Sequence, residues 1–220
     1  MLLALTRIRG RPNQLTVYIE GDGAAWITPY HPPSDPTPRQ PTALAMAASD
    51  PSDAVIYLGR PCQYLDDIHL AECSVPWWTH QRFAPEVLRA YEQGLNSLKA
   101  ESGAQTFRLV GYSGGGVIAA LLALRRNDVD ALITVASPLA TGEWIRSKGL
   151  SPLSGSIDPL SEPGVLPPAI FWTGSRDEVV PISSVELFSR HKGGEIRQIS
   201  DYDHQCCWAH DWPRLLKESP

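Results

Sequence analysis

Short apolar runs recur along the chain, and segments with apolar residues at helical spacing separate most of them. The apolar runs predict strands over residues 2–8, 14–20, 54–58, 107–110, 131–136, 169–173 and 195–199. The helical spacing predicts helices over residues 42–48, 85–100, 117–124, 143–147, 184–190 and 208–218. Strands that alternate with helices favour a mostly parallel sheet with right-handed crossovers and helices on both faces. The pattern therefore predicts the α/β class.

Three segments carry neither pattern. Residues 29–41 contain six prolines, which predict an irregular surface loop because proline lacks the backbone donor of a strand or helix. Residues 62–82 show no clear periodicity, and residues 139–168 are rich in Ser, Gly and Pro. The chain shows no repeat and no linker, and 220 residues suit one well-buried core. We therefore expect a single domain over residues 1–220.

The most informative stretch is residues 107–126, a strand, a G-x-S-x-G turn around Ser113 and an apolar helix. Such a turn presents a nucleophilic serine at the top of a parallel sheet. Gly111 and Gly115 leave room for the serine hydroxyl. Gly114, Gly115 and Gly116 each cost up to about 1 kcal/mol in a helix interior, which indicates a close backbone approach. The alternative is a glycine-rich turn with a bystander serine.

Other polar residues follow the strands whose carboxyl ends would meet at the same edge of the sheet, where ligands bind. Asp177 follows the strand at 169–173, and His204 follows the strand at 195–199. The order Ser113, Asp177, His204 is that of a Ser-Asp-His hydrolase. Rival bases and acids remain open at this stage, namely His210, Asp158, Asp201 and Asp203.

The segments GYSGGG, GSRDEVVP and DYDHQCCW resemble the nucleophile elbow, acid loop and histidine loop of α/β-hydrolase-fold serine hydrolases. The resemblance extends from Leu15 onward. With YIEGDGAAW and GRPCQY, it is closest to a group of poorly characterised bacterial α/β-hydrolase-like proteins. It implies the α/β-hydrolase fold with a minimal cap or none. It also implies that Ser113 is the nucleophile, that His204 is the general base, and that Asp177 orients the imidazole.

The resemblance also implies two backbone donors for an oxyanion. Gly114 supplies one N–H group, and Asp22 supplies the other, with Gly23 as the alternative. Glu20 stands where this superfamily often has histidine. A carboxylate at Asp22 opposes a negatively charged transition state unless it turns outward or meets a cation such as Arg60 or Arg82.

Aromatic residues near the strand ends are candidates for lining a substrate pocket. They are Trp26, Trp77, Trp78, Tyr112 and Trp144. Residues 139–168 occupy the place where this superfamily inserts lids, and about thirty residues suffice for a flap only. We therefore expect an open or lightly covered cleft.

The composition excludes several classes of binding partner. A net charge of -5 without a basic run argues against nucleic acid or an anionic membrane surface. No apolar run is long enough to span a bilayer, and residues 1–5 are too short for a signal-peptide core. The expected partner is a small-molecule ester-like substrate, and no cofactor is expected.

The four cysteines leave the compartment open. Cys62 and Cys73 either pair or are free buried thiols, and pairing would favour an oxidising compartment such as the periplasm. Cys206 and Cys207 do not match zinc-ligand spacing, so no metal site is expected. They are interpreted as buried packing residues, or one of them as a disulfide partner.

These observations favour hydrolysis of a carboxylic ester, thioester or amide through a Ser113 acyl-enzyme. Acyl transfer would use the same three residues. A non-catalytic binding module that reuses the fold is the alternative from another class. A metal-dependent hydrolase is the least favoured.

Overall fold

The computed structural model describes residues 2–23 and 31–220. Within these residues, seven strands form one sheet in the order β1-β3-β2-β4-β5-β6-β7. The strands are β1 (Ala4–Ile8), β2 (Gln14–Ile19), β3 (Ala54–Leu58), β4 (Thr106–Tyr112), β5 (Val129–Val135), β6 (Ala169–Gly174) and β7 (Glu195–Ile199). All neighbouring pairs are parallel except β1 and β3, which pair antiparallel at one edge. The predicted sheet is confirmed.

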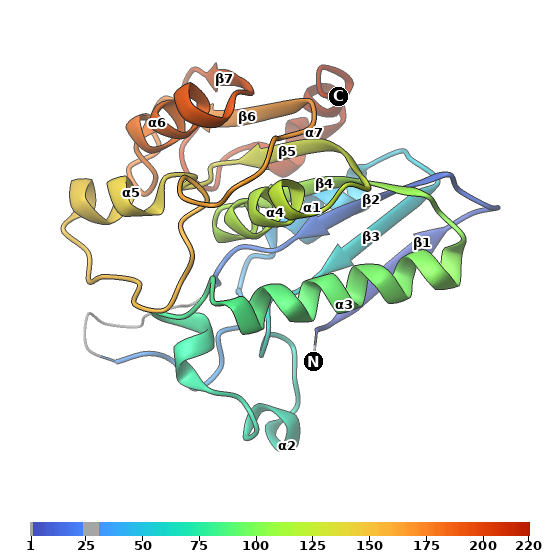
Figure 1. The fold of residues 1–220 in the computed structure, drawn as a ribbon, viewed down its shortest axis with the longest axis horizontal. Helices are drawn as coiled ribbons and strands as arrows, with labels where there is room; N and C mark the ends of the chain where they lie inside the picture. The colour runs from blue at the N-terminus through green and yellow to red at the C-terminus, as the bar shows by residue number, and fades with distance from the viewer. Residues whose placement is uncertain (1, 24–30) are drawn as a thin grey trace.

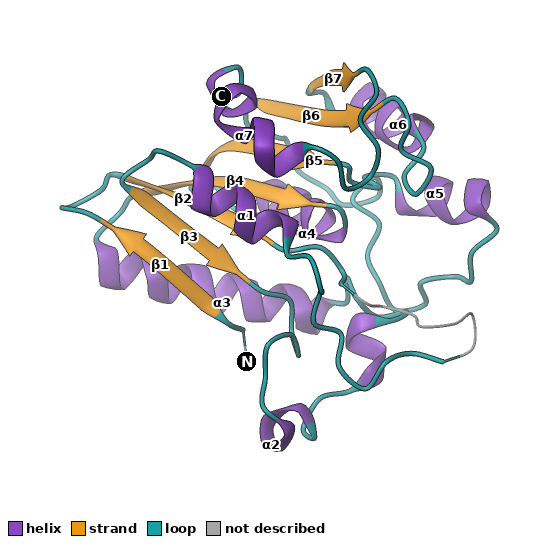
Figure 2. Cartoon of the chain, turned by 180° about the vertical axis from the view of Figure 1, so that it is seen from behind, coloured by secondary structure: helices purple, strands orange, loops and turns teal. Residues whose placement is uncertain are grey.

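Helices cover both faces of this sheet (Figures 1 and 2). On one face pack α3 (Pro85–Ser102), α4 (Gly114–Arg125) and α6 (Ile182–Lys192). On the other face pack α1 (Thr42–Ser49) and α7 (Trp208–Lys217), which lie in front of the sheet in Figure 2. The remaining elements are α2 (Asp67–Leu70), the 3-10 helix η1 (Val75–Trp78) and α5 (Thr141–Lys148).

The two faces alternate along each buried strand. On β2, Leu15, Val17 and Ile19 pack with α3 and α4, whereas Tyr18 packs with α1 and α7. The Tyr18 ring meets Trp212 edge-to-face at 6.0 Å, and the Trp212 Nε1–H donates to the Tyr18 hydroxyl at 2.6 Å. Alternate side chains of one strand therefore belong to two hydrophobic cores, as expected for a sheet covered on both sides.

The two segments without a clear sequence pattern also have little regular secondary structure. Residues 62–82 contain only α2 and η1. Beyond α5, residues 149–168 lack helix and strand, and Leu153, Ile157 and Leu160 pack against the core next to α3 and α4. This segment lies against the body of the fold, so no large cap is built from the described residues. That residues 1–220 form one domain stays a prediction.

The cysteines pair in two ways. Cys62 bonds to Cys73 across the loop after β3, with a Cα–Cα distance of 5.9 Å. Cys206 bonds to its neighbour Cys207 in the loop before α7. Of the two interpretations, the disulfide partner agrees with the structure and the buried packing residue does not, because Cys206 is exposed and Cys207 is half-buried. None of the described helices combines the length and the hydropathy that a bilayer crossing requires.

Candidate active site

Ser113 is the single residue between β4 and α4, and its backbone conformation is one that L-residues rarely adopt. Its φ is 50° and its ψ is -124°, and its N–H donates to the Val135 carbonyl at 2.8 Å. A non-glycine residue with positive φ carries strain of about 1–3 kcal/mol, which surrounding structure must hold in place. A Cβ on Gly111 would lie 2.4 Å from the Gly116 Cα, so the turn closes only with glycine there.

The predicted close approach of the glycines is confirmed. A Cβ on Gly115 would lie 2.2 Å from the Ile19 carbonyl oxygen, and one on Gly116 would lie 2.0 Å from the Ser137 Oγ. Helix α4 begins at Gly114, three residues before the predicted start, so these glycines form its first turn. The glycines lower helix stability, but because they have no side chain, α4 can start directly against β2.

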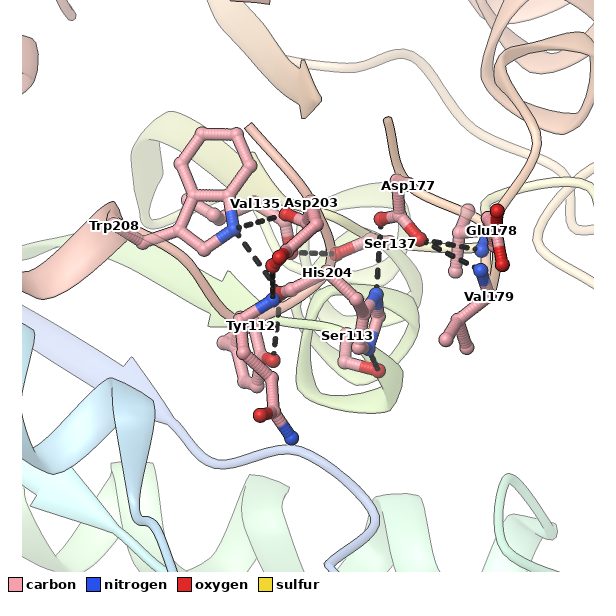
Figure 3. A network of polar contacts seen from close by, with 12 residues as sticks. Tyr112, Ser113, Val135, Ser137, Asp177, Glu178, Val179, Asp203, His204 and Trp208 are labelled. Atoms are coloured by element: carbon pink, nitrogen blue, oxygen red, sulfur yellow. Dashed lines mark hydrogen bonds and ion pairs between the residues drawn. The ribbon is translucent and has the colours of Figure 1, made fainter. Parts of the chain in front are cut away.

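Three residues from different strand ends meet one another, namely Ser113, Asp177 and His204 (Figure 3). The His204 Nε2 lies 3.1 Å from the Ser113 Oγ, and the His204 Nδ1 lies 2.9 Å from the Asp177 Oδ2. An ionised carboxylate only accepts hydrogen bonds, so the imidazole proton is assigned to Nδ1. Nε2 is then free to accept the serine proton. The structure thus brings together all three residues that the sequence order singled out.

Backbone groups hold the Asp177 carboxylate. Its side chain is 2% exposed, and its Oδ1 accepts the N–H groups of Val179 and Val180, each at 2.9 Å. The remaining oxygen is left for the imidazole. Burial and these two donors fix the carboxylate orientation before any substrate arrives.

Two side chains hold the loop of His204. The Tyr112 hydroxyl donates to the His204 carbonyl at 2.9 Å, and the Trp208 Nε1–H donates to the same oxygen at 3.1 Å (Figure 3). Burial raises the pKa of Tyr112, so its phenol remains a neutral donor. The Tyr112 ring also lies 5.5 Å from the imidazole. The residue before the serine therefore positions the histidine.

The residues that could have replaced His204 as the base or Asp177 as the acid form their contacts with other groups. His210 is exposed on α7 and contacts Asp211 at 2.7 Å. The three other aspartates serve local structure or the surface: Asp158 accepts the N–H groups of Thr141 and Gly142, Asp201 pairs with Arg176, and Asp203 accepts the N–H groups of Gln205 and Cys206. None of them contacts the His204 ring.

The loop after β2 brings Asp22 beside Gly114. The Asp22 carboxylate bonds to the Arg60 Nη1 at 2.7 Å and to the Arg82 Nη1 at 2.8 Å. Burial by itself raises the pKa of this carboxyl, but the charges of Arg82 and Arg60 outweigh burial and hold the pKa below its ordinary value. Asp22 is therefore ionised and meets both cations that the sequence offered. The N–H groups of Asp22 and Gly114 bond to no other described residue.

Glu20 anchors the same loop, a role that the sequence analysis missed. Its carboxylate accepts the N–H groups of Gly21, Ala43 and Leu44 at 3.0–3.3 Å, and the Tyr57 hydroxyl at 3.1 Å. Ala43 and Leu44 open α1, so the carboxylate also lies at the positive end of a helix. Burial raises the pKa of Glu20, and the four donors oppose this shift.

A cavity of about 540 Å³ opens at Ser113 and His204. Among the predicted aromatics, Tyr112 and Trp144 line it, and the Trp144 Nε1–H is held by the Val179 carbonyl at 2.8 Å. Trp77 and Trp78 do not line it, which corrects the prediction. They lie in η1, where Trp78 is buried and Trp77 packs against the core. Trp26 lies outside the described residues.

Other polar residues of the cavity include Glu20, Asp22, Arg39 and Arg82. The described residues contain no group of three or more His, Cys, Asp or Glu side chains placed to hold a metal ion.

No family model and no curated protein matches this sequence. The structure, in contrast, is similar to solved α/β hydrolases over 99% of the chain. Est1E from Butyrivibrio proteoclasticus has a TM-score of 0.63 at 15% identity, with 92% of its chain covered. Esterase PE8 has a TM-score of 0.61 at 18% identity, with 98% covered. Alpha/beta hydrolase domain-containing protein 10 from mouse has a TM-score of 0.63 at 16% identity, with 92% covered.

The chain therefore has the α/β-hydrolase fold, as its motifs predicted. At these identities the similarity establishes the fold, and the chemistry has to be argued from the site itself.

Proposed function

We propose that this protein hydrolyses an ester-like bond through a covalent acyl-enzyme on Ser113. One observation carries the proposal. The Asp177 carboxylate, the His204 imidazole and the Ser113 hydroxyl form a continuous hydrogen-bonded chain of 2.9 and 3.1 Å that ends in a cavity. A serine hydroxyl is a weak nucleophile until a base within bonding distance takes its proton.

In the first half of the reaction, the His204 Nε2 takes the hydroxyl proton while the Ser113 Oγ attacks the carbonyl carbon. Asp177 keeps the imidazole in the required tautomer and stabilises the imidazolium. The imidazolium then gives this proton to the leaving oxygen as the bond to the acyl group breaks. In the second half, His204 takes a proton from water, the resulting hydroxide attacks the acyl-enzyme, and Ser113 recovers its proton.

The developing oxyanion accepts hydrogen bonds from the N–H groups of Gly114 and Asp22. The Asp22 carboxylate does not oppose this charge, because Arg60 and Arg82 neutralise it. Gly114 is required beside it, since a Cβ at that position would lie 2.1 Å from the Asp22 Oδ1. The dipole of α4 adds positive potential at the same point.

The assignment is tested with a fluorophosphonate probe and p-nitrophenyl esters of several chain lengths. Labelling maps to Ser113, and both labelling and turnover are lost in Ser113→Ala and His204→Ala. The matched control is His210→Ala, which removes an exposed histidine six positions away and leaves labelling and turnover intact. Turnover that survives Ser113→Ala but stops with a chelator would refute the acyl-enzyme. A folded protein that is neither labelled nor active would indicate a binding module.

We also propose that the protein works in an oxidising compartment such as the periplasm. The Cys62–Cys73 disulfide supports this, because such bonds persist where thiols are oxidised. Mass spectrometry of protein isolated from its native cells under thiol alkylation tests it. Alkylated Cys62 and Cys73 would contradict the proposal.

A further inference from the structure

Arg82 lines the cavity, and one of its guanidinium nitrogens has no hydrogen-bond partner among the described residues. Its side chain is only 8% exposed, its Nε–H donates to the Thr79 carbonyl at 2.6 Å, and its Nη1 binds Asp22. Its Nη2 has no hydrogen-bond partner in the described part of the chain, although the residue lines the cavity beside Ser113 and His204. A buried guanidinium thus retains two N–H groups that no described residue accepts.

Arg39 is a second cation on the same cavity. Its side chain is exposed, and it has no hydrogen bond or ion pair with any described residue. The backbone near it is held in place, because the Thr37 Oγ1 accepts the Tyr64 N–H at 2.7 Å. Arg39 therefore comes from a segment that is bonded to the body of the fold.

Guanidinium groups outnumber carboxylates at the cavity once the residue bonded to Asp22 is included. The Glu20 carboxylate accepts four hydrogen bonds from the surrounding protein. Asp22 supplies one negative charge against two guanidinium groups, those of Arg60 and Arg82. The lining itself has two carboxylates, Glu20 and Asp22, and two guanidinium groups, Arg39 and Arg82. Arg60, which is bonded to Asp22, adds a third guanidinium, so cations exceed anions by one here on a chain whose net charge is -5.

We propose that the substrate is an ester with a carboxylate on its acyl or alcohol part, which Arg82 Nη2 and Arg39 bind. The proposal rests on the hydrolase function proposed above and names its substrate class. Guanidinium groups donate in a plane that matches a carboxylate, and a partly enclosed cavity strengthens the attraction relative to open water. Arg82 is the fixed part of this site, and Arg39 is the exposed part.

Two substrate pairs test the proposal, and each exchanges a methyl group for a carboxylate. The acyl pair is p-nitrophenyl valerate and p-nitrophenyl hemiglutarate, and the alcohol pair is 4-tolyl acetate and 4-acetoxybenzoate. The readout is the ratio of kcat/KM for the anionic ester to that for its neutral partner, after spontaneous hydrolysis is subtracted. Comparing this ratio between variants cancels the intrinsic reactivity of the esters.

In at least one pair, Arg39→Gln lowers this ratio by about three- to tenfold, and raising the salt concentration lowers it in the wild type. The matched control is Arg190→Gln at the end of α6, which removes the same charge away from the cavity and leaves the ratio unchanged. A ratio that stays within twofold in both pairs on Arg39→Gln, with esters still hydrolysed through Ser113, overturns the inference and leaves the proposed function standing. A protein that hydrolyses none of the four esters and is not labelled at Ser113 refutes both.

Discussion

Replacing Gly114 with alanine tests how the loop that carries Asp22, the proposed oxyanion donor, is held. The new Cβ would lie 2.1 Å from the Asp22 Oδ1 and 2.5 Å from its Cγ. The carboxylate must retreat by about 1 Å to restore van der Waals contact. Its partners cannot follow freely, because Arg60 and Arg82 are buried and bonded to the backbone at Arg82 and Thr79. The methyl group therefore moves Asp22, whose N–H is a proposed oxyanion donor.

The magnitude follows from this geometry. Displacing an oxyanion donor by about 1 Å costs about 10²-fold in kcat. Overpacking against a carboxylate that two buried guanidinium groups hold in place costs about 1–3 kcal/mol of unfolding free energy. Helix propensity acts in the opposite direction, because alanine is favoured over glycine by up to about 1 kcal/mol. A loss of activity and stability in Gly114→Ala must therefore come from the contact with Asp22.

The assay is kcat/KM on p-nitrophenyl butyrate together with urea unfolding, and the matched control is Gly94→Ala. Gly94 lies inside α3, and a Cβ there would meet only the Leu2 Cδ1, at 3.9 Å. The control gains about 0.5–1 kcal/mol of unfolding free energy and keeps full activity. If Gly114→Ala kept kcat/KM within twofold of wild type, the proposed role of the Asp22 loop would be refuted.

Three further changes test the remaining parts of the site. Asp22→Asn lowers the unfolding free energy at pH 7 by about 3–5 kcal/mol, since it leaves two buried cations uncompensated. The folded-state pKa of Asp22 is depressed, so its contribution to the unfolding free energy is present above its unfolded pKa of about 3.9 and is lost as pH falls through the folded pKa. Urea unfolding measured from pH 7 to pH 2 therefore shows a smaller fall in unfolding free energy for Asp22→Asn than for the wild type. Ser113→Gly abolishes ester hydrolysis but raises the unfolding free energy by about 1 kcal/mol, measured by urea unfolding, because glycine tolerates a φ of 50°; a destabilised variant would contradict the strain argument. Tyr112→Phe lowers kcat about three- to tenfold because the His204 carbonyl keeps only Trp208 as donor, and an unchanged kcat would exclude this positioning role.

Local sequence was sufficient where one element determines the outcome. The apolar run at residues 14–20 predicts a strand, and the alternation of strands with helices predicts a sheet covered on both faces; the structure has both. The G-x-S-x-G around Ser113 predicts a strand-to-helix turn, and three glycines predict a close approach that the contacts of Gly115 and Gly116 bear out. The helix boundary was misplaced because glycine has low helix propensity, and packing against β2 overrides that preference.

Aromatic residues were predicted less well. Trp77, Trp78 and Trp144 all lie in loop-rich segments, and only Trp144 lines the cavity. A tryptophan can fill a core or a pocket equally well, and the choice depends on which face of its short helix meets the core. Trp77 meets the core packed on α3 and α4, which no local pattern specifies.

The sequence by itself determined the order of strands and helices, the strained serine turn and the residue types available for chemistry, because these depend on neighbours within a few positions. Tertiary structure decided which charges meet. Asp22 reaches Arg60 and Arg82, which lie 38 and 60 positions away, and Glu20 reaches the start of α1, 23 positions away. Such contacts arise from strand order and loop packing, which bring distant segments within a few ångströms. Only the folded chain therefore reveals that the Asp22 carboxylate is neutralised, and that Arg82 and Arg39 keep donors without a partner among residues 2–23 and 31–220.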